Sequence, residues 1–185
     1  DPRPRDALGR DLVDHLRLAR TEHGQSRKGA AAEPYVNHVI EVAAILAEHG
    51  APLPVVLAGL LHDTVEDTEV THADLVATFG AEVAGLVAEA TDDKTLPKEM
   101  RKALQVSQGP KKSDGAKQLK LADKISNLRA IADSPPANWI HARRVEYVGW
   151  AGRVAAGLRG VNPALDALFD GTYRAAMAKL SAEEG

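Results

Sequence analysis

Hydrophobic residues along the chain recur at intervals of three and four positions, and no stretch alternates in the manner of a half-buried strand. Many of these periodic stretches begin at a capping residue or proline and end at glycine, which are signals for helix boundaries. The predicted helices cover residues 6–23, 34–49, 53–67, 71–79, 81–90, 97–108, 116–132, 138–158 and 163–179. The pattern therefore predicts an all-α helical bundle of roughly nine helices.

The most apolar stretch, residues 55–61, ends abruptly in ionisable side chains. The residues in question are His62, Asp63, Glu66 and Asp67. On a continuous helix these four side chains fall within a sector of about 140°. Three carboxylates held together in a buried place are costly unless a cation neutralises them, which favours a bound divalent metal. A solvated helix end is the alternative, and this stretch alone supports both equally.

His38 is a second candidate ligand, because it shares a helical row with Val42 and Ile45 and should face inward. A lone inward histidine is more often a hydrogen-bonded core residue than a metal ligand. The nearby His62 and Asp63 raise the chance that it binds a metal. The sequence around His38 therefore allows both roles, a hydrogen-bonded core residue and a metal ligand.

Asp123 and Asn127 lie one helical turn apart, on a row flanked by Leu119 and Ile131. That pattern predicts burial, and a buried carboxylate needs a partner. The partner is either a salt bridge or a metal. Together with the other candidates, Asp123 completes a set of two imidazoles and two carboxylates that suits one ion of Mn(II), Fe(II) or Zn(II). Ligands from three helices are common in the metal sites of helical proteins.

Cations at three places are candidates for contacts with phosphate. Arg27 and Lys28 occupy a short polar loop, where they form either a phosphate clamp or a solvated turn. Lys98 lies on a basic face near the start of its helix. Arg144 and Tyr147 share one side of the helix over 138–158 and are candidates for a pocket wall.

The composition narrows the class of protein. The 185 residues, 44% hydrophobic and 26% charged, are typical of a single globular domain, expected over 1–185 with a core at about 8–170. Cysteine is absent, so His, Asp, Glu or Asn must hold any metal. No apolar stretch approaches ~20 residues, and the first residues do not resemble a signal peptide, so we expect no membrane partner and a cytoplasmic location. The net charge of −3 argues against a general nucleic-acid binder.

These motifs resemble those of a known family. A His, a His-Asp pair and a distant Asp are the signature of HD-domain phosphohydrolases. The closer resemblance is to the small alarmone hydrolases, the animal-type stand-alone relatives of the RelA/SpoT hydrolase domain. It is carried by HGQSRK (23–28), PYVNH (34–38), LLHDTVEDT (60–68), TDDKTLPK (91–98) and LKLADKISNLR (119–129). Two departures are Val39 in place of the usual proline and Gly59 in place of alanine, and neither removes a functional group.

The resemblance implies an all-α HD fold, Mn(II) as cofactor, and removal of pyrophosphate from the 3′ position of ppGpp and pppGpp, leaving GDP or GTP. It implies metal binding by His38, His62, Asp63 and Asp123. Glu66 and Asp67 would position and deprotonate the attacking water. The substrate contacts would come from Arg27, Lys28 and Asn127, with Lys98, Arg144 and Tyr147 as weaker inferences.

Two other functions remain open on the sequence. The same pocket would also suit another phosphorylated nucleotide such as NADPH, with release of its 2′-phosphate. A nucleotide-binding sensor without catalytic activity is the second alternative, although the retained Glu66 and Asp67 argue against it. The oligomeric state is not predicted.

Overall fold

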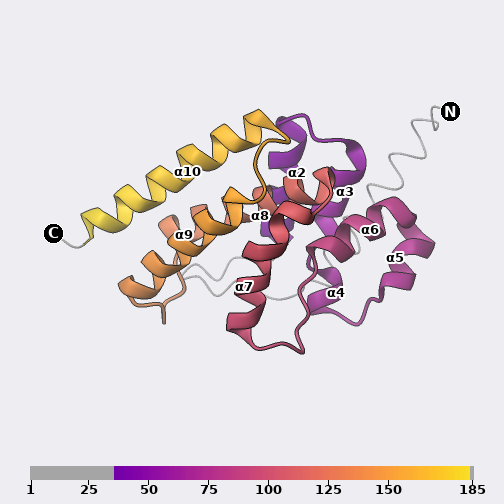
Figure 1. Cartoon of the computed structure of the whole chain (residues 1–185), viewed down its shortest axis with the longest axis horizontal. Coiled ribbons are helices and arrows are strands. Elements are labelled where there is room, and N and C mark those ends of the chain that lie inside the picture. The colour runs from indigo at the N-terminus through magenta and orange to yellow at the C-terminus, as the bar shows by residue number, and fades with distance from the viewer. Residues whose placement is uncertain (1–35, 184–185) are drawn as a thin grey trace.

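The computed structural model describes residues 36–183, and the regular elements of this part of the chain are helices. They are α2 (Val36–Glu48), α3 (Leu53–Leu61), α4 (Thr64–Asp67), α5 (His72–Phe79), α6 (Ala81–Ala90), α7 (Lys98–Gln108), a 3-10 turn (Gly109–Lys111), α8 (Asp114–Asp133), α9 (His141–Ala156) and α10 (Pro163–Ala182). The predicted all-α class is confirmed (Figure 1). The predicted helix over 6–23, Arg27 and Lys28 lie outside the described residues, and the single domain over 1–185 stays a prediction.

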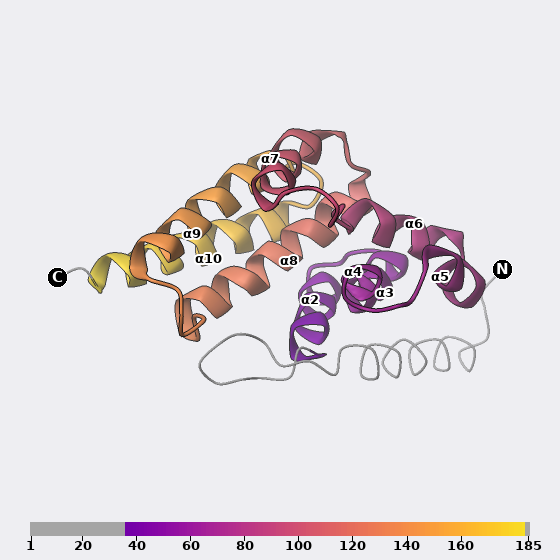
Figure 2. The same cartoon turned by 90° about the horizontal axis from the view of Figure 1, so that it is seen from below.

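The long helix α8 forms the centre of the fold. It packs against α2, α3, α6, α9 and α10. Figure 2 shows α9 and α10 running beside one part of α8, with the α2–α6 group gathered around the other part. Because helices surround α8 on several sides, several of its polar residues are buried. These are Gln118, Lys120, Asp123, Lys124 and Ser126. Each of them needs a partner inside the protein.

The chain bends where a continuous helix over 53–67 was predicted. Helix α3 ends at Leu61, residues 62 and 63 form a turn, and α4 adds only a short helix over Thr64–Asp67. The prediction of one helix is therefore wrong at this point. Asp63 has φ −100° and ψ −1°, away from helical values. The four ionisable side chains therefore do not share a single helix face, and the bend sends them toward different partners.

Other predicted boundaries agree with the structure to within a few residues. Thr71 and Asp74 form the expected capping box at the start of α5. Helix α6 covers 81–90 as predicted, whereas α9 begins at His141, three residues later than expected. None of the helices over residues 36–183 is long and apolar enough to cross a membrane.

Asn162 joins the start of α10 to the rest of the bundle. Its Oδ1 accepts hydrogen bonds from the backbone N–H groups of Ala164 and Leu165, at 3.1 and 3.2 Å. Its Nδ2 donates to the carbonyl oxygen of His49 at 2.9 Å and to Gln118 Oε1 at 3.0 Å. One side chain thus caps a helix and bridges to α8 and to the end of α2.

We expect Asn162→Ala to lower the free energy of unfolding by about 1–2 kcal/mol, because the cap and the bridging bonds are lost together. Urea denaturation monitored by circular dichroism measures the change. Asn162→Ser is the matched control, since it keeps a capping oxygen and loses only the bridge. An alanine variant as stable as the wild type would contradict this role.

Candidate metal centre and substrate pocket

Three helices bring His38, His62 and Asp123 together inside the bundle. One ligand atom from each lies within 4.8 Å of the others, and all three residues are buried. The Nε2 atom of His38 is 3.2 Å from Asp123 Oδ1, and the Nε2 atom of His62 is 3.6 Å from the same oxygen. Asp63 lies outside this set of three but beside it, with Oδ2 3.2 Å from His62 Nε2. The four predicted ligands are therefore neighbours.

The other ring nitrogen of each histidine is already engaged. His62 Nδ1 lies 2.9 Å from the carbonyl oxygen of Gly59, which only accepts, so Nδ1 carries a proton. His38 Nδ1 lies 2.8 Å from Ser126 Oγ.

Gly59 also allows α3 to approach α2, because a Cβ there would lie 3.0 Å from Leu46 Cδ1. The close packing of α2 and α3 thus helps to bring the two imidazoles together.

The donor set fits a divalent cation. His62 Nε2 is buried without a hydrogen-bond partner, although two carboxylate oxygens lie near it. In the neutral ring this atom bears a lone pair, which repels carboxylate oxygens unless a proton or a metal lies between them. Two imidazole nitrogens and two carboxylates are ligands that Mn(II), Fe(II) and Zn(II) all accept. The residues present can therefore hold the ion that an HD-type site requires.

The charges at this cluster control one another. Burial alone would lower the pKa of His62, but the charges of Asp63 and Asp123 raise it well above its usual value. Burial alone would raise the pKa of Asp123, whereas Lys124 and the two imidazoles hold it well below its usual range. The pKa of Asp63 is likewise held low by His62, against the effect of burial. Both carboxylates are therefore ionised and attract a cation.

The turn at 62–63 directs Glu66 and Asp67 toward the segment over 91–97. Glu66 Oε1 accepts a hydrogen bond from the backbone N–H of Asp92 at 2.5 Å. Asp67 Oδ1 accepts from Lys94 Nζ at 2.5 Å, and the same ammonium donates to the carbonyl oxygen of Glu66 at 2.6 Å. Burial raises the pKa of Glu66 above its ordinary value, assisted by the charge of Asp63. Lys94 Nζ also lies 3.9 Å from Glu66 Oε2, so the same ammonium faces both carboxylates.

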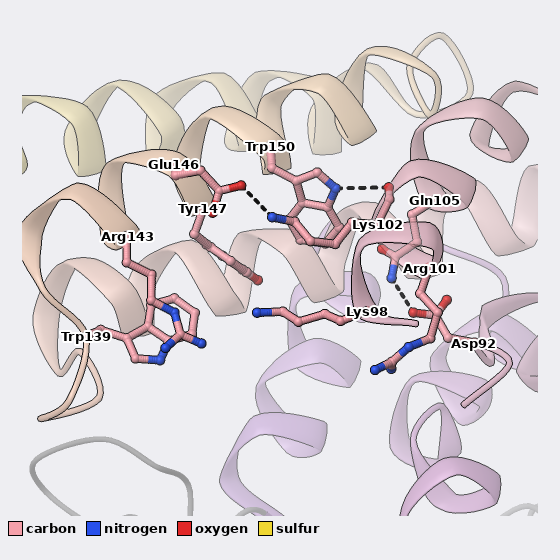
Figure 3. A pocket seen from close by; sticks show the side chains of 10 residues that line it. All are labelled: Asp92, Lys98, Arg101, Lys102, Gln105, Trp139, Arg143, Glu146, Tyr147 and Trp150. Atoms are coloured by element: carbon pink, nitrogen blue, oxygen red, sulfur yellow. Dashed lines mark hydrogen bonds and ion pairs between the residues drawn. The ribbon is translucent and has the colours of Figure 1, made fainter. Parts of the chain in front are cut away.

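A pocket with a volume of about 280 Å³ lies between α7 and α9 (Figure 3). Its lining residues are Asp92, Lys98, Arg101, Lys102, Gln105, Trp139, Arg143, Glu146, Tyr147 and Trp150. Four cations and two carboxylates give the lining a positive excess, and the Nε atom of Arg101 is buried without a hydrogen-bond partner. The pocket is therefore suited to a multiply charged anion.

Aromatic rings form a second feature of this pocket. The ring of Tyr147 lies between those of Trp139 and Trp150, with centroids 5.5 and 5.3 Å away. The Arg143 guanidinium lies over the Trp139 ring at 4.2 Å, and Figure 3 shows these two side chains together at one end of the pocket. Aromatic faces beside cations suit a molecule that carries both a flat ring and phosphates.

Lys124 links the pocket to the metal-ligand cluster. Its side chain is only 4% exposed, its Nζ lies 3.0 Å from Asp123 Oδ2, and it lies over the Trp150 ring at 4.8 Å. Burial alone would lower the pKa of Lys124, but the charge of Asp123 raises it above its usual value. Asp92 provides a second link, because it lines the pocket and its backbone N–H holds Glu66.

The remaining predicted substrate contacts have different places. Lys98 and Tyr147 line the pocket. Asn127 lies beside the metal-ligand cluster, where its Nδ2 donates to Asp123 Oδ1 at 2.7 Å. Arg144 forms an ion pair with Glu183 at 2.5 Å, and the neighbouring Arg143 lines the pocket instead.

Lys124, Ser126 and Arg143 were missed in the sequence. The sequence of α8 mixes apolar and polar residues, so nothing in it marked the first two.

Comparisons with known proteins give the same picture. The sequence profile of the HD domain matches residues 16–148. A human guanosine-3′,5′-bis(diphosphate) 3′-pyrophosphohydrolase is 49% identical over 150 residues, which cover 80% of this chain and 84% of the human protein. The protein of the same name from Drosophila melanogaster is 44% identical over 88% of this chain and 93% of its own length.

A solved structure described as a metazoan ortholog of SpoT that hydrolyses ppGpp superposes with a TM-score of 0.85. It is 42% identical and covers 89% of this chain and 94% of its own. A protein from Listeria monocytogenes superposes with a TM-score of 0.65 at 37% identity, over 78% of this chain and 99% of its own. The predicted resemblance is confirmed, and the chain belongs to the HD-domain family, in the group that contains the small guanosine-3′,5′-bis(diphosphate) 3′-pyrophosphohydrolases.

Proposed function

We propose that this protein is a metal-dependent 3′-pyrophosphohydrolase that converts ppGpp and pppGpp to GDP and GTP. The observation that carries the proposal is the metal-ligand cluster of His38, His62 and Asp123 joined by Lys124 to a cationic, aromatic pocket. Relatives with 43–49% identity over most of this chain carry that activity in their names. Mn(II) is the proposed ion, with Fe(II) and Zn(II) as the alternatives.

The proposed metal ligands are His38, His62, Asp63 and Asp123. When bound, a divalent ion there supplies Lewis acidity, which makes water more acidic and polarises a phosphoryl oxygen. The two imidazoles offer Nε2, since the Nδ1 atoms lie against Ser126 and Gly59. Asp123 offers Oδ1, which faces both imidazoles and also accepts from Asn127 Nδ2, whereas Lys124 lies against Oδ2. Each of these contacts limits the side chain to one orientation, so less conformational entropy is lost when the ion binds.

Glu66 is the proposed general base. Its carboxylate is partly buried, and the Asp92 N–H donates to Oε1. The other oxygen, Oε2, lies 3.9 Å from Lys94 Nζ and is the one proposed to take the proton. Its raised pKa makes it a stronger base than an ordinary glutamate. Asp67 has a supporting role in this proposal: its bond to Lys94 ties α4 to the segment that leads into α7 and the cationic pocket.

The pocket is the proposed substrate site. Lys98, Arg101 and Arg143 would bind phosphate oxygens, and the aromatic rings would pack against the nucleoside. Tyr147 and Asn127 remain proposed substrate contacts, and Asn127 also donates a hydrogen bond to Asp123. Arg27 and Lys28 remain proposed phosphate contacts. A small nucleotide substrate also fits the expected cytoplasmic location, which stays a prediction.

The test of this function is pyrophosphate release from ppGpp by the purified protein with and without added Mn²⁺. We expect release only with the ion, and His62→Ala should abolish both metal retention and turnover because Asp123 and Asp63 lose their shared partner. His72→Ala is the control, since His72 is an exposed histidine at the start of α5.

The same assay decides between the alternatives when NADPH is measured in parallel. Phosphate release from NADPH that exceeds pyrophosphate release from ppGpp would overturn the substrate assignment. Binding of ppGpp without hydrolysis in the presence of any divalent ion tested would instead identify a nucleotide-binding sensor without catalytic activity.

We expect Glu66→Gln to retain the metal while the turnover rate falls about 10²- to 10⁴-fold, the usual loss for a missing general base. Because burial raises the pKa of Glu66, the wild-type kcat/KM should fall as the pH drops through a value above the ordinary 4.5. Metal occupancy, measured at each pH, separates this loss from protonation of the ligands. A Gln variant with near-normal turnover would exclude Glu66 as the base.

Adjacent arginines on α9 provide a matched pair for the substrate site. Arg143→Ala should raise the KM for ppGpp about 10- to 100-fold, because charged hydrogen bonds to phosphate are lost. Arg144→Ala should leave KM near the wild-type value, since Arg144 is paired with Glu183 outside the pocket. Steady-state kinetics measures both, and an equal effect of the two changes would place the substrate elsewhere.

A further inference from the structure

A chain of hydrogen bonds leads from the His38 imidazole to the surface of the protein. His38 Nδ1 lies 2.8 Å from Ser126 Oγ, and Ser126 Oγ lies 2.5 Å from Glu41 Oε2. Arg129 Nη1 donates to the other oxygen of Glu41 at 2.9 Å. Ser126 is completely buried, whereas the Glu41 and Arg129 side chains are 34% and 41% exposed. The four residues alternate between α2 and α8.

The direction of each bond follows from the chemistry of Glu41. A carboxylate only accepts hydrogen bonds, so the single hydroxyl proton of Ser126 points to Glu41. Ser126 Oγ then offers a lone pair to His38 and accepts a proton from Nδ1. A neutral His38 is thereby limited to the tautomer with the proton on Nδ1 and the lone pair on Nε2. That lone pair is on the nitrogen 3.2 Å from Asp123 Oδ1, inside the metal-ligand cluster.

We propose that Glu41 and Ser126 are positioning residues that select the metal-binding tautomer of His38. Glu41 acts through Ser126: without its carboxylate, the serine hydroxyl can turn and donate to Nδ1, which moves the ring proton to Nε2 and blocks the lone pair. Arg129 holds Glu41 from the solvent side. The inference rests on the proposed metal site, and it assigns a function to a serine that is buried in the hydrophobic core beside Ile125 and Leu128.

Variants of Glu41 and Ser126 distinguish this positioning role from a role in packing alone. Glu41→Gln keeps the side-chain volume but only one accepting oxygen, for which the two donors Ser126 and Arg129 compete, so it should keep the bond direction in part. Glu41→Ala and Ser126→Ala both remove the selection. A packing role would instead rank the variants by the volume removed, and it would leave the tautomer of His38 unchanged.

The experiment uses protein labelled with ¹⁵N in its histidine rings, metal-free, at an alkaline pH where the rings are neutral. His38→Gln identifies the signals of His38. We expect the wild type to show the Nδ1–H form, Glu41→Ala and Ser126→Ala to shift toward a mixture, and Glu41→Gln to lie between them. Glu48→Ala, an exposed change on the same helix, is the control and should match the wild type.

Calorimetric titration with Mn²⁺ gives the second measurement. Glu41→Ala and Ser126→Ala should bind the ion about 10- to 100-fold more weakly, with Glu41→Gln closer to the wild type. An unchanged His38 tautomer in both alanine variants, or affinities within about twofold of the wild type, would overturn the inference. If the wild type itself binds no divalent ion, the proposed function fails, whereas the ring signals still decide whether the hydrogen-bond chain selects the tautomer.

Discussion

The constraint on which this structure depends is the burial of the Asp123 carboxylate between two imidazoles. Asp123 is 8% exposed, and its Oδ1 lies within 3.2 and 3.6 Å of the Nε2 atoms of His38 and His62. An ionised carboxylate is stable in such a place only with positive charge on several sides. Lys124 supplies one positive charge at Oδ2. At Oδ1, a second positive charge must come from a proton or a metal ion at the histidine nitrogens. The fold therefore brings the side chains together but needs a cation to balance the charge of Asp123.

The central position of α8 extends this constraint to the whole site. A helix with neighbours on several sides must satisfy its buried polar groups internally, and on α8 several of their partners belong to the candidate site. Lys120 Nζ donates to the carbonyl oxygen of Ala90 at the end of α6. The segment that follows contains Asp92, whose backbone N–H donates to Glu66. Lys124 lies against Trp150 in the pocket, and Ser126 connects to Glu41 on α2. One buried helix thus aligns the ligands, the proposed base and the pocket wall.

Periodicity predicted most of the helices and the burial of Asp123, whose helical row has Leu119 one turn before it and Ile131 two turns after it. It failed where the chain leaves helical geometry. The sector of 140° assumed a continuous helix through His62 and Asp63, and the turn there sends Glu66 and Asp67 to Asp92 and Lys94.

Side-chain direction was a second difficulty. Arg143 and Arg144 differ by one position, about 100° around the helix, and a shift of that size decides which one faces the pocket. Lys124 and Ser126 gave no signal in the sequence, since their partners lie on helices far away along the chain.

The distribution of charge explains why the site has two parts. At the cluster, the charges of Asp63 and Asp123 would balance a divalent ion, and among the described residues Lys124 adds a further positive charge beside Asp123. With an ion bound, the cluster would have little net charge and would attract a polyanion only weakly. The pocket lining has four cations against two carboxylates, an excess of two positive charges. In the proposed function, this positive potential attracts the phosphorylated nucleotide to the pocket, and the ion held by the cluster assists the hydrolysis. Because Lys124 contacts both parts, a change at that one buried ammonium would alter ion binding and the pocket wall together.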